Sequence, residues 1–159
     1  MEITAISDIS QAKVIDFFKQ HWGSTEMVIS SGVYDCSKLD GYAVLESDKT
    51  VIGLITYIIT NDTCEIISLD SIEENKGIGT SLIQAVERGA LENECKYINL
   101  ITTNDNLFAL KFYQKRGYVL ADLYRNAVGK ARKLKPGIPF EGNDGIPIRD
   151  EIKLEKLLR

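Results

Sequence analysis

Two glycines with one residue between them, Gly77 and Gly79, follow a short apolar run and precede an amphipathic segment. The apolar run at 66–69 predicts a strand. From Ile78 onward, apolar residues recur with the period of a helix that has one buried face. A strand, a glycine turn and a helix leave free backbone N–H groups at the helix N-terminus, where phosphate binds. The pattern therefore predicts a phosphate-binding turn.

Two common phosphate motifs are excluded by the residues of this turn. A P-loop ends in Gly-Lys-Ser/Thr, whereas here Lys76 precedes Gly77 and no glycine stands five residues earlier. A dinucleotide-binding fingerprint needs a third glycine, at the position that Leu82 occupies. Gly-x-Gly alone also fits an ordinary strand-to-helix connection, so a second motif has to support a phosphate site.

The second motif runs from Asn106 to Tyr118 and has the form N-x-x-A-x-x-F-Y-x-x-x-G-Y. Together the two blocks resemble the GNAT superfamily of acyl-CoA-dependent N-acetyltransferases, and the resemblance covers residues 65–118. It implies a mixed α/β (α+β) fold, in which helices flank a mostly antiparallel central sheet and a strand-to-helix turn binds the pyrophosphate. It also implies acetyl-CoA as the cofactor and transfer of an acetyl group to a primary amine.

The resemblance assigns residues to the cofactor. In the family a Q/R-x-x-G-x-G/A loop binds the pyrophosphate, a bulged strand offers a backbone N–H, and a later asparagine and tyrosine face the cofactor. Carried over to this sequence, the expected cofactor-binding residues are Leu69, Ser71, Asn75, Lys76, Gly77, Ile78, Gly79, Thr80, Asn106, Phe112 and Tyr113.

One position departs from the family pattern. Glu74 stands where the family has Gln or Arg, and an ionised carboxylate cannot donate a hydrogen bond to phosphate. Glu73 adds a second unfavourable charge, which Lys76 offsets in part, while Asn75 can donate from its amide. The departure keeps open weaker cofactor binding and, as an alternative function, a non-catalytic domain that binds or senses acyl-CoA. Transfer of acyl chains other than acetyl also stays open.

Direct attack by an amine needs a proton acceptor for the ammonium group and a proton donor for the departing thiolate. The resemblance points to Tyr113 as the acid, because a phenol with a pKa of about 10 stays protonated at neutral pH; a core aromatic residue is the alternative. Glu65 is the expected base. On a regular strand Glu65 shares a face with Ile67 and Leu69, which predicts partial burial and a raised pKa. A solvated strand-end carboxylate is the alternative for Glu65, and Asp70 is the reserve base.

The acceptor amine is expected to contact Trp22 and Asp70. His21 and Trp22 stand just before Gly23, where the first helix is predicted to end, and the family often builds its acceptor site from this region. The alternatives are that Trp22 fills the core and that His21 merely ends the helix. The mixed composition of residues 24–39 predicts no single element there.

The other elements follow from periodicity and turn residues. Strands are predicted at 2–6, 41–45, 51–60, 64–69, 96–103, 118–123 and 149–156, with a helix as the alternative for the last of these. Helices are predicted before Gly23, from Ile78, at 106–116 and at 127–134. All three prolines fall within 136–147, which is therefore a loop that either covers the site or only links two elements.

Length and composition limit the remaining possibilities. A chain of 159 residues that is 44% hydrophobic predicts one globular domain over 1–159. A net charge of −4 argues against nucleic acid as a partner. The longest apolar run, at 51–59, is too short to cross a bilayer, so no membrane partner is expected. The expected partner is a small-molecule or peptide amine acceptor, with a homodimer as the assembly common in the family.

The cysteines indicate the compartment. Cys36, Cys64 and Cys95 are an odd number of widely spaced thiols in a chain without a signal segment, so reduced thiols in the cytoplasm are expected. No metal site is expected, because the chain has one histidine and no close pair of cysteines.

Overall fold

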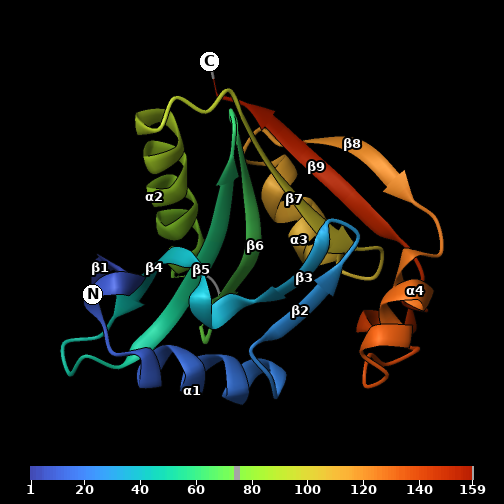
Figure 1. The fold of residues 1–159 in the computed structure, drawn as a ribbon, viewed down its shortest axis with the longest axis horizontal. Helices are drawn as coiled ribbons and strands as arrows, with labels where there is room; N and C mark the ends of the chain where they lie inside the picture. Colours follow the sequence, from blue (N-terminus) through green and yellow to red (C-terminus); the bar gives the residue numbers. More distant parts are fainter. Residues whose placement is uncertain (74–75, 159) are drawn as a thin grey trace. The chain divides into compact units, whose positions relative to one another are not determined.

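The computed structural model describes residues 1–73 and 76–158. They form a mixed α/β fold with a seven-stranded sheet in the order β1-β4-β5-β6-β7-β9-β8 and a two-stranded sheet of β2 and β3 (Figure 1). The pairs β1–β4, β4–β5, β5–β6 and β8–β9 are antiparallel. The predicted fold class, a mostly antiparallel sheet with flanking helices, is confirmed.

The strands are β1 (Glu2–Ala5), β2 (Glu26–Ile29), β3 (Gly32–Asp35), β4 (Asp40–Leu45), β5 (Val51–Thr60), β6 (Thr63–Ser71), β7 (Tyr97–Thr103), β8 (Val119–Tyr124) and β9 (Glu151–Leu157). The α-helices of the described residues are α1 (Gln11–Trp22), α2 (Ile78–Glu92), α3 (Leu107–Gln114) and α4 (Ala127–Leu134). The chain divides into two compact units. Unit 1 comprises Met1–Met27, Asp35–Ile98 and Leu158, and unit 2 comprises Val28–Tyr34 and Asn99–Leu157.

In unit 1, α2 lies beside β5 and β6, and a glycine allows the close contact (Figure 1). A Cβ atom added at Gly53 would lie 2.5 Å from Cγ2 of Ile78 and 3.3 Å from Cδ1 of Leu82, so a larger residue would push the helix away. Most of the apolar face predicted for α2 is buried, at Ile78, Leu82, Ile83, Val86 and Ala90, whereas Leu91, which was predicted on the same face, is 42% exposed. This burial stabilises the helix that begins directly after the glycine turn.

Helix α1 has a polar start and a glycine end. The Ser10 side chain accepts a hydrogen bond from Lys13 N at 3.3 Å, and Gly23 closes the helix with φ +74°. The predicted end at Gly23 is therefore confirmed. Phe18 is fully buried, and its ring centroid lies 5.0 Å from that of Trp22, the last residue of the helix. This packing holds Trp22 against the core of unit 1.

In unit 2, the β2–β3 turn is tied to β9 by a buried carboxylate. Oε1 of Glu151 accepts hydrogen bonds from the backbone N–H of Ser30 at 2.8 Å and from its hydroxyl at 2.5 Å. Tyr118 is also buried, and its ring centroid lies 5.4 Å from that of Tyr113. The unassigned region 24–39 thus contains a hairpin whose turn is fixed by a residue far along the chain.

Most element predictions are confirmed, with one change at a helix end. The predicted helix 127–134 is confirmed, and the C-terminal segment is a strand as expected. Helix α3 ends at Gln114 rather than Arg116, because Lys115 is the C-cap and a tighter turn follows to Gly117, which has φ +92°. None of the helices in the described part of the chain is long and apolar enough to cross a membrane.

Candidate active site

The glycine turn of unit 1 places a residue without a side chain at the start of α2. Gly77 is the N-cap residue with φ +74° and makes no side-chain cap bond. A Cβ atom at Gly77 would meet nothing within 4 Å, so the approach to the first amides is open. The first N–H groups of a helix have no partners within the helix and attract anions. The residues present therefore fit a pyrophosphate group.

The charges of this turn partly neutralise each other. Nζ of Lys76 lies 2.6 Å from Oε2 of Glu73, and this hydrogen bond raises the pKa of the lysine. The Ser71 hydroxyl donates to the carbonyl of Glu73 at 3.2 Å. The predicted compensation of Glu73 by Lys76 is confirmed, whereas Glu74 and the expected cofactor residue Asn75 lie outside the described residues.

Strand β6 contains a bulge that changes which side chains share a face. Thr56 of β5 pairs with Ser68, but the next residue, Tyr57, pairs with Ile66, so Ile67 is an extra residue. Because paired residues share a face and alternate along each strand, Ile66 and Ser68 point to opposite faces. The bulge thus interrupts the alternation along β6.

The predicted position of Glu65 is corrected by this bulge. Glu65 does not share a face with Leu69, as a regular strand would require. It lies on the opposite face, with Ser68 and Asp70. Glu65 is half-buried, as expected. The two candidate bases of β6 therefore occupy one face of the strand.

Asp70 and Trp22, the two expected substrate-binding residues, are brought together in unit 1. The Trp22 indole donates a hydrogen bond to the Asp70 carboxyl group. Burial raises the pKa of Asp70, while this hydrogen bond and the nearby charge of His21 oppose the shift. Among residues 1–73 and 76–158, Oδ2 of Asp70 is the one buried side-chain oxygen or nitrogen found without a hydrogen-bond partner.

His21 is exposed and oriented by α1. Its Nδ1 lies 2.9 Å from the carbonyl oxygen of Phe17, and the two rings stack with centroids 4.2 Å apart. A carbonyl only accepts, so Nδ1 carries the proton, and in the neutral ring Nε2 has the free lone pair. The helix thus sets the tautomer of His21 near the Asp70 carboxyl group.

The site residues of the second motif lie in unit 2. Asn106 caps α3, since its Oδ1 accepts from Ala109 N at 3.1 Å. Tyr113 is buried, with its ring centroid 5.2 Å from that of Phe112. The cap predicted for Asn106 is confirmed. The roles of Asn106, Phe112 and Tyr113 toward a cofactor stay predictions.

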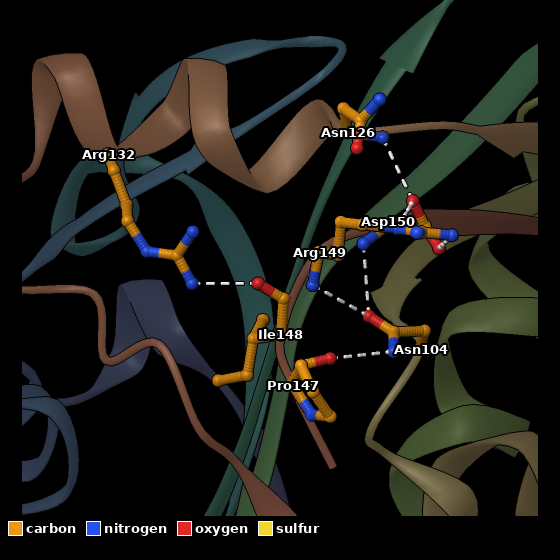
Figure 2. A network of polar contacts seen from close by, with 7 residues as sticks. All are labelled: Asn104, Asn126, Arg132, Pro147, Ile148, Arg149 and Asp150. Carbon is orange, nitrogen blue, oxygen red and sulfur yellow. Dashed lines mark hydrogen bonds and ion pairs between the residues drawn. The ribbon is translucent and has the colours of Figure 1, made fainter.

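Sequence reasoning missed a polar network that fixes the loop 136–147 in unit 2 (Figure 2). Oδ1 of Asn104 accepts from the backbone N–H groups of Arg149 and Asp150, each at 3.0 Å, and its Nδ2 donates to the Pro147 carbonyl at 2.9 Å. Arg132 donates to the carbonyls of Pro139 and Ile148, each at 2.7 Å. The only sequence signal was the polar Asn104-Asp105 pair directly after a predicted strand.

Comparison with known proteins identifies similar chains. The model of the acetyltransferase (GNAT) family matches residues 10–118. The uncharacterized protein YxbD of Bacillus subtilis (strain 168) is 55% identical over 159 residues, which is 100% of each chain.

Solved structures share the fold. A GNAT family acetyltransferase from Elizabethkingia anophelis with acetyl-CoA bound is 25% identical, with a TM-score of 0.63 over 76% of this chain and 77% of that one. A Bacillus subtilis acetyltransferase in complex with CoA is 18% identical, with a TM-score of 0.71 over 99% of each chain. The second likeness is one of fold.

Proposed function

Because the chain belongs to the GNAT acetyltransferase family, we propose that it transfers the acetyl group of acetyl-CoA to a primary amine by direct attack. The observation that carries the proposal is the start of α2, where the N-cap residue is a glycine with open space around its Cβ position and the first backbone N–H groups of a helix attract anions. The acetyl-CoA bound to the similar Elizabethkingia enzyme supports the choice of this donor.

Different residues of the chain carry out the two proton transfers of the reaction. Acetyl-CoA supplies an acetyl group activated as a thioester. One carboxylate of β6, Glu65 or Asp70, takes a proton from the acceptor ammonium, so that a neutral nitrogen attacks. Tyr113 donates its phenolic proton to sulfur as the C–N bond forms and the C–S bond breaks, and it regains the second nitrogen proton through solvent. The backbone N–H of Leu69 polarises the acetyl carbonyl.

The test is thermal melting with and without millimolar acetyl-CoA. A ligand at 100 times its dissociation constant adds about 2.7 kcal/mol to the free energy of unfolding, which is readily measured. Gly79→Glu should abolish the shift, since it adds a side chain and a negative charge at the first turn of α2. Gly129→Glu is the matched control, because a Cβ at this glycine of α4 meets nothing within 4 Å.

The outcomes separate enzyme from binding protein. A shift that Gly79→Glu removes, followed by thiol release with amines, supports the enzyme. A shift without thiol release for any amine would support the acyl-CoA-binding alternative. If acetyl-CoA does not raise the melting temperature, the proposed acetyl-CoA site at the start of α2 is wrong.

The proposed partners are a small-molecule or peptide amine and a second copy of the chain. Strand β8 is at the edge of the sheet, and Val119, Leu120 and Leu123 on it are exposed by 56–63%. An exposed apolar edge strand favours pairing with another strand. Size-exclusion chromatography tests the homodimer, with Leu123→Lys expected to shift it toward monomer.

The proposed compartment is the cytoplasm. Cys36, Cys64 and Cys95 are buried and form no disulfide bond, and burial raises the pKa of Cys64 to about 12. Reduced thiols persist where the environment is reducing. Cell fractionation with an antibody tests this placement.

A further inference from the structure

The segment 123–140 of unit 2 carries charge of one sign only. It contains no acidic residue and five basic ones, Arg125, Lys130, Arg132, Lys133 and Lys135. None of these side chains takes part in the proposed acetyl transfer. The whole chain has a net charge of −4, so this positive charge is a local departure from the rest of the molecule. Such a segment attracts anionic groups at one place on the surface.

Helix α4 presents two of these cations to solvent. Its buried residues are Ala127, Val128 and Ala131, whereas Lys130 and Lys133 are exposed. The two lysines are three positions apart, a spacing that makes side chains neighbours on a helix. Within the described part of the chain, neither lysine forms an ion pair. Both ammonium groups are therefore available to carboxylates of a partner.

Phe140 is exposed and nevertheless held in place. It is 77% exposed, and the guanidinium carbon of Arg132 lies 4.2 Å from the centroid of its ring. The same guanidinium donates to the carbonyl oxygens of Ile138 at 3.2 Å and of Pro139 and Ile148 at 2.7 Å each. Figure 2 shows the last of these bonds. A ring fixed in this way loses little conformational freedom when a partner binds.

The lysine pair and the fixed ring flank the same helix. Lys133 directly follows Arg132, the residue whose guanidinium contacts the Phe140 ring. We call Lys130, Lys133 and Phe140 the α4 surface. A preorganised aromatic side chain with polar residues beside it is the usual composition of a protein-binding site, in which the ring supplies most of the binding energy and the charges supply specificity.

We propose that the α4 surface docks an acidic segment of a partner protein, whose carboxylates bind Lys130 and Lys133 and whose apolar side chain packs on Phe140. The charge of the molecule favours this partner over other anionic ones. A bilayer or a nucleic acid is an extended anionic surface, which a net charge of −4 repels, whereas a short segment contacts the α4 surface alone. A single ring also gives no platform on which successive bases could stack.

Fluorescence anisotropy of a short labelled peptide tests the proposal. The probe is a run of glutamates around a central Phe-Leu pair, and a matched probe has two alanines in place of that pair. The natural protein should bind the Phe-Leu peptide, and Lys130→Glu combined with Lys133→Glu should raise its Kd about tenfold. Lys115→Glu makes the same charge change at another exposed lysine of unit 2 and should leave the Kd unchanged.

A change at Phe140 separates apolar docking from charge attraction. Phe140→Ala should raise the Kd of the Phe-Leu peptide at least fivefold and leave that of the alanine peptide unchanged. Equal melting temperatures of the natural protein and the variants exclude unfolding as the cause of weaker binding. None of these measurements involves acetyl-CoA, so their result is independent of the proposed acetyl transfer.

Three results would overturn the proposal. The first is no binding of the Phe-Leu peptide at millimolar concentration. The second is equal weakening by Lys115→Glu, which would mean that the peptide responds only to the overall charge of unit 2. The third is that phosphatidylglycerol vesicles or single-stranded oligothymidylate bind more tightly than the peptide and lose this binding in the Lys130 and Lys133 variant, which would assign the surface to a membrane or a nucleic acid.

Discussion

The two compact units carry opposite net charge. Met1–Met27 and Asp35–Ile98 of unit 1 contain sixteen acidic and seven basic residues, whereas Asn99–Leu157 of unit 2 contains seven acidic and eleven basic residues. The whole-chain value of −4 therefore averages an acidic and a basic part. The proposed anion-binding turn lies in the acidic unit, so the proposal requires oriented backbone amides, rather than net charge, to attract the pyrophosphate there.

The units also differ in what fixes their irregular segments. In unit 1, glycines let backbone and helix approach closely, as at Gly41 and Gly53. In unit 2, the loop 136–147 is held by side chains that bond to backbone carbonyls and amides, such as Arg132 and Asn104. Unit 1 should therefore be most sensitive to added volume, and unit 2 to loss of polar groups.

The largest effect is expected from Gly41→Ala in unit 1. An added Cβ would lie 2.0 Å from the Ile55 carbonyl oxygen and 2.6 Å from Cδ1 of Ile6. Since the strand backbone cannot shift easily, the free energy of unfolding should fall by about 3 kcal/mol, as measured by urea denaturation. Gly129→Ala in α4 is the control and should stabilise by up to about 1 kcal/mol. If Gly41→Ala leaves the free energy of unfolding unchanged, unit 1 is not especially sensitive to added volume and the proposed difference between the units is wrong.

Asp105→Ala should weaken unit 2 by about 2–3 kcal/mol. Oδ1 of Asp105 accepts from the Thr103 hydroxyl at 2.5 Å, and Oδ2 accepts from Asn143 N at 3.0 Å and from Asn143 Nδ2 at 3.2 Å. Limited proteolysis should then cut within 136–147. Glu141→Ala, an exposed carboxylate of the same loop, should leave the cleavage rate unchanged. If the loop 136–147 resists proteolysis equally in both variants, contacts other than those of Asp105 hold it in place.

Asp70→Asn should stabilise the protein at neutral pH, although it removes a charge from the proposed site. The raised pKa of Asp70 means that the folded protein binds this proton more tightly than the unfolded chain. The destabilisation by ionised Asp70 is absent below the ordinary carboxyl pKa of about 4 and complete above the raised folded pKa. Melting curves should show the advantage of the variant at pH 7 and its disappearance near pH 3. An advantage independent of pH would point to altered packing.

The smallest effect is expected at the acidic residues of the glycine turn. Glu73→Gln frees Lys76 from its ion pair and should tighten acetyl-CoA binding only a few-fold at low salt, since solvent screens an exposed ion pair. Calorimetric titration measures this change, which should fade at high salt. Glu92→Gln, at the other end of α2, is the control. If both variants tighten binding equally, only the net charge of unit 1 matters.

The sequence predicted those features that depend on neighbouring residues. The start of α2 at Ile78 follows from local periodicity, and the cap at Asn106 from the type of one residue. The face of Glu65 was wrong because the resemblance implied a bulge in this strand without its position, and the bulge at Ile67 exists only in the pairing with β5. Likewise, Trp22 and Asp70 were both expected to contact the acceptor, but the interaction between them depends on packing between segments 48 positions apart in the sequence.

The turn of the β2–β3 hairpin illustrates the same limit. Its residues Ser30 and Ser31 are compatible with many turns, and the choice is made by Glu151, more than a hundred residues later. The network around Asn104 similarly joins residues about 45 positions apart. Such contacts cannot be derived from local composition, because each polar group is equally well satisfied by water in the unfolded chain.

The extra residue in β6 has a consequence for how this strand tolerates mutation over time. Substitution at Ile67 alters one buried side chain, whereas its deletion would join Ile66 directly to Ser68 and restore regular alternation. Glu65 would keep the face that it shares with Asp70, because Ile66 and Ser68 already point to opposite faces. The deletion would remove only the break in the ladder, where the extra residue of β6 has no partner on β5. Alignments of homologous chains should therefore show a gap at position 67 only where that break is dispensable.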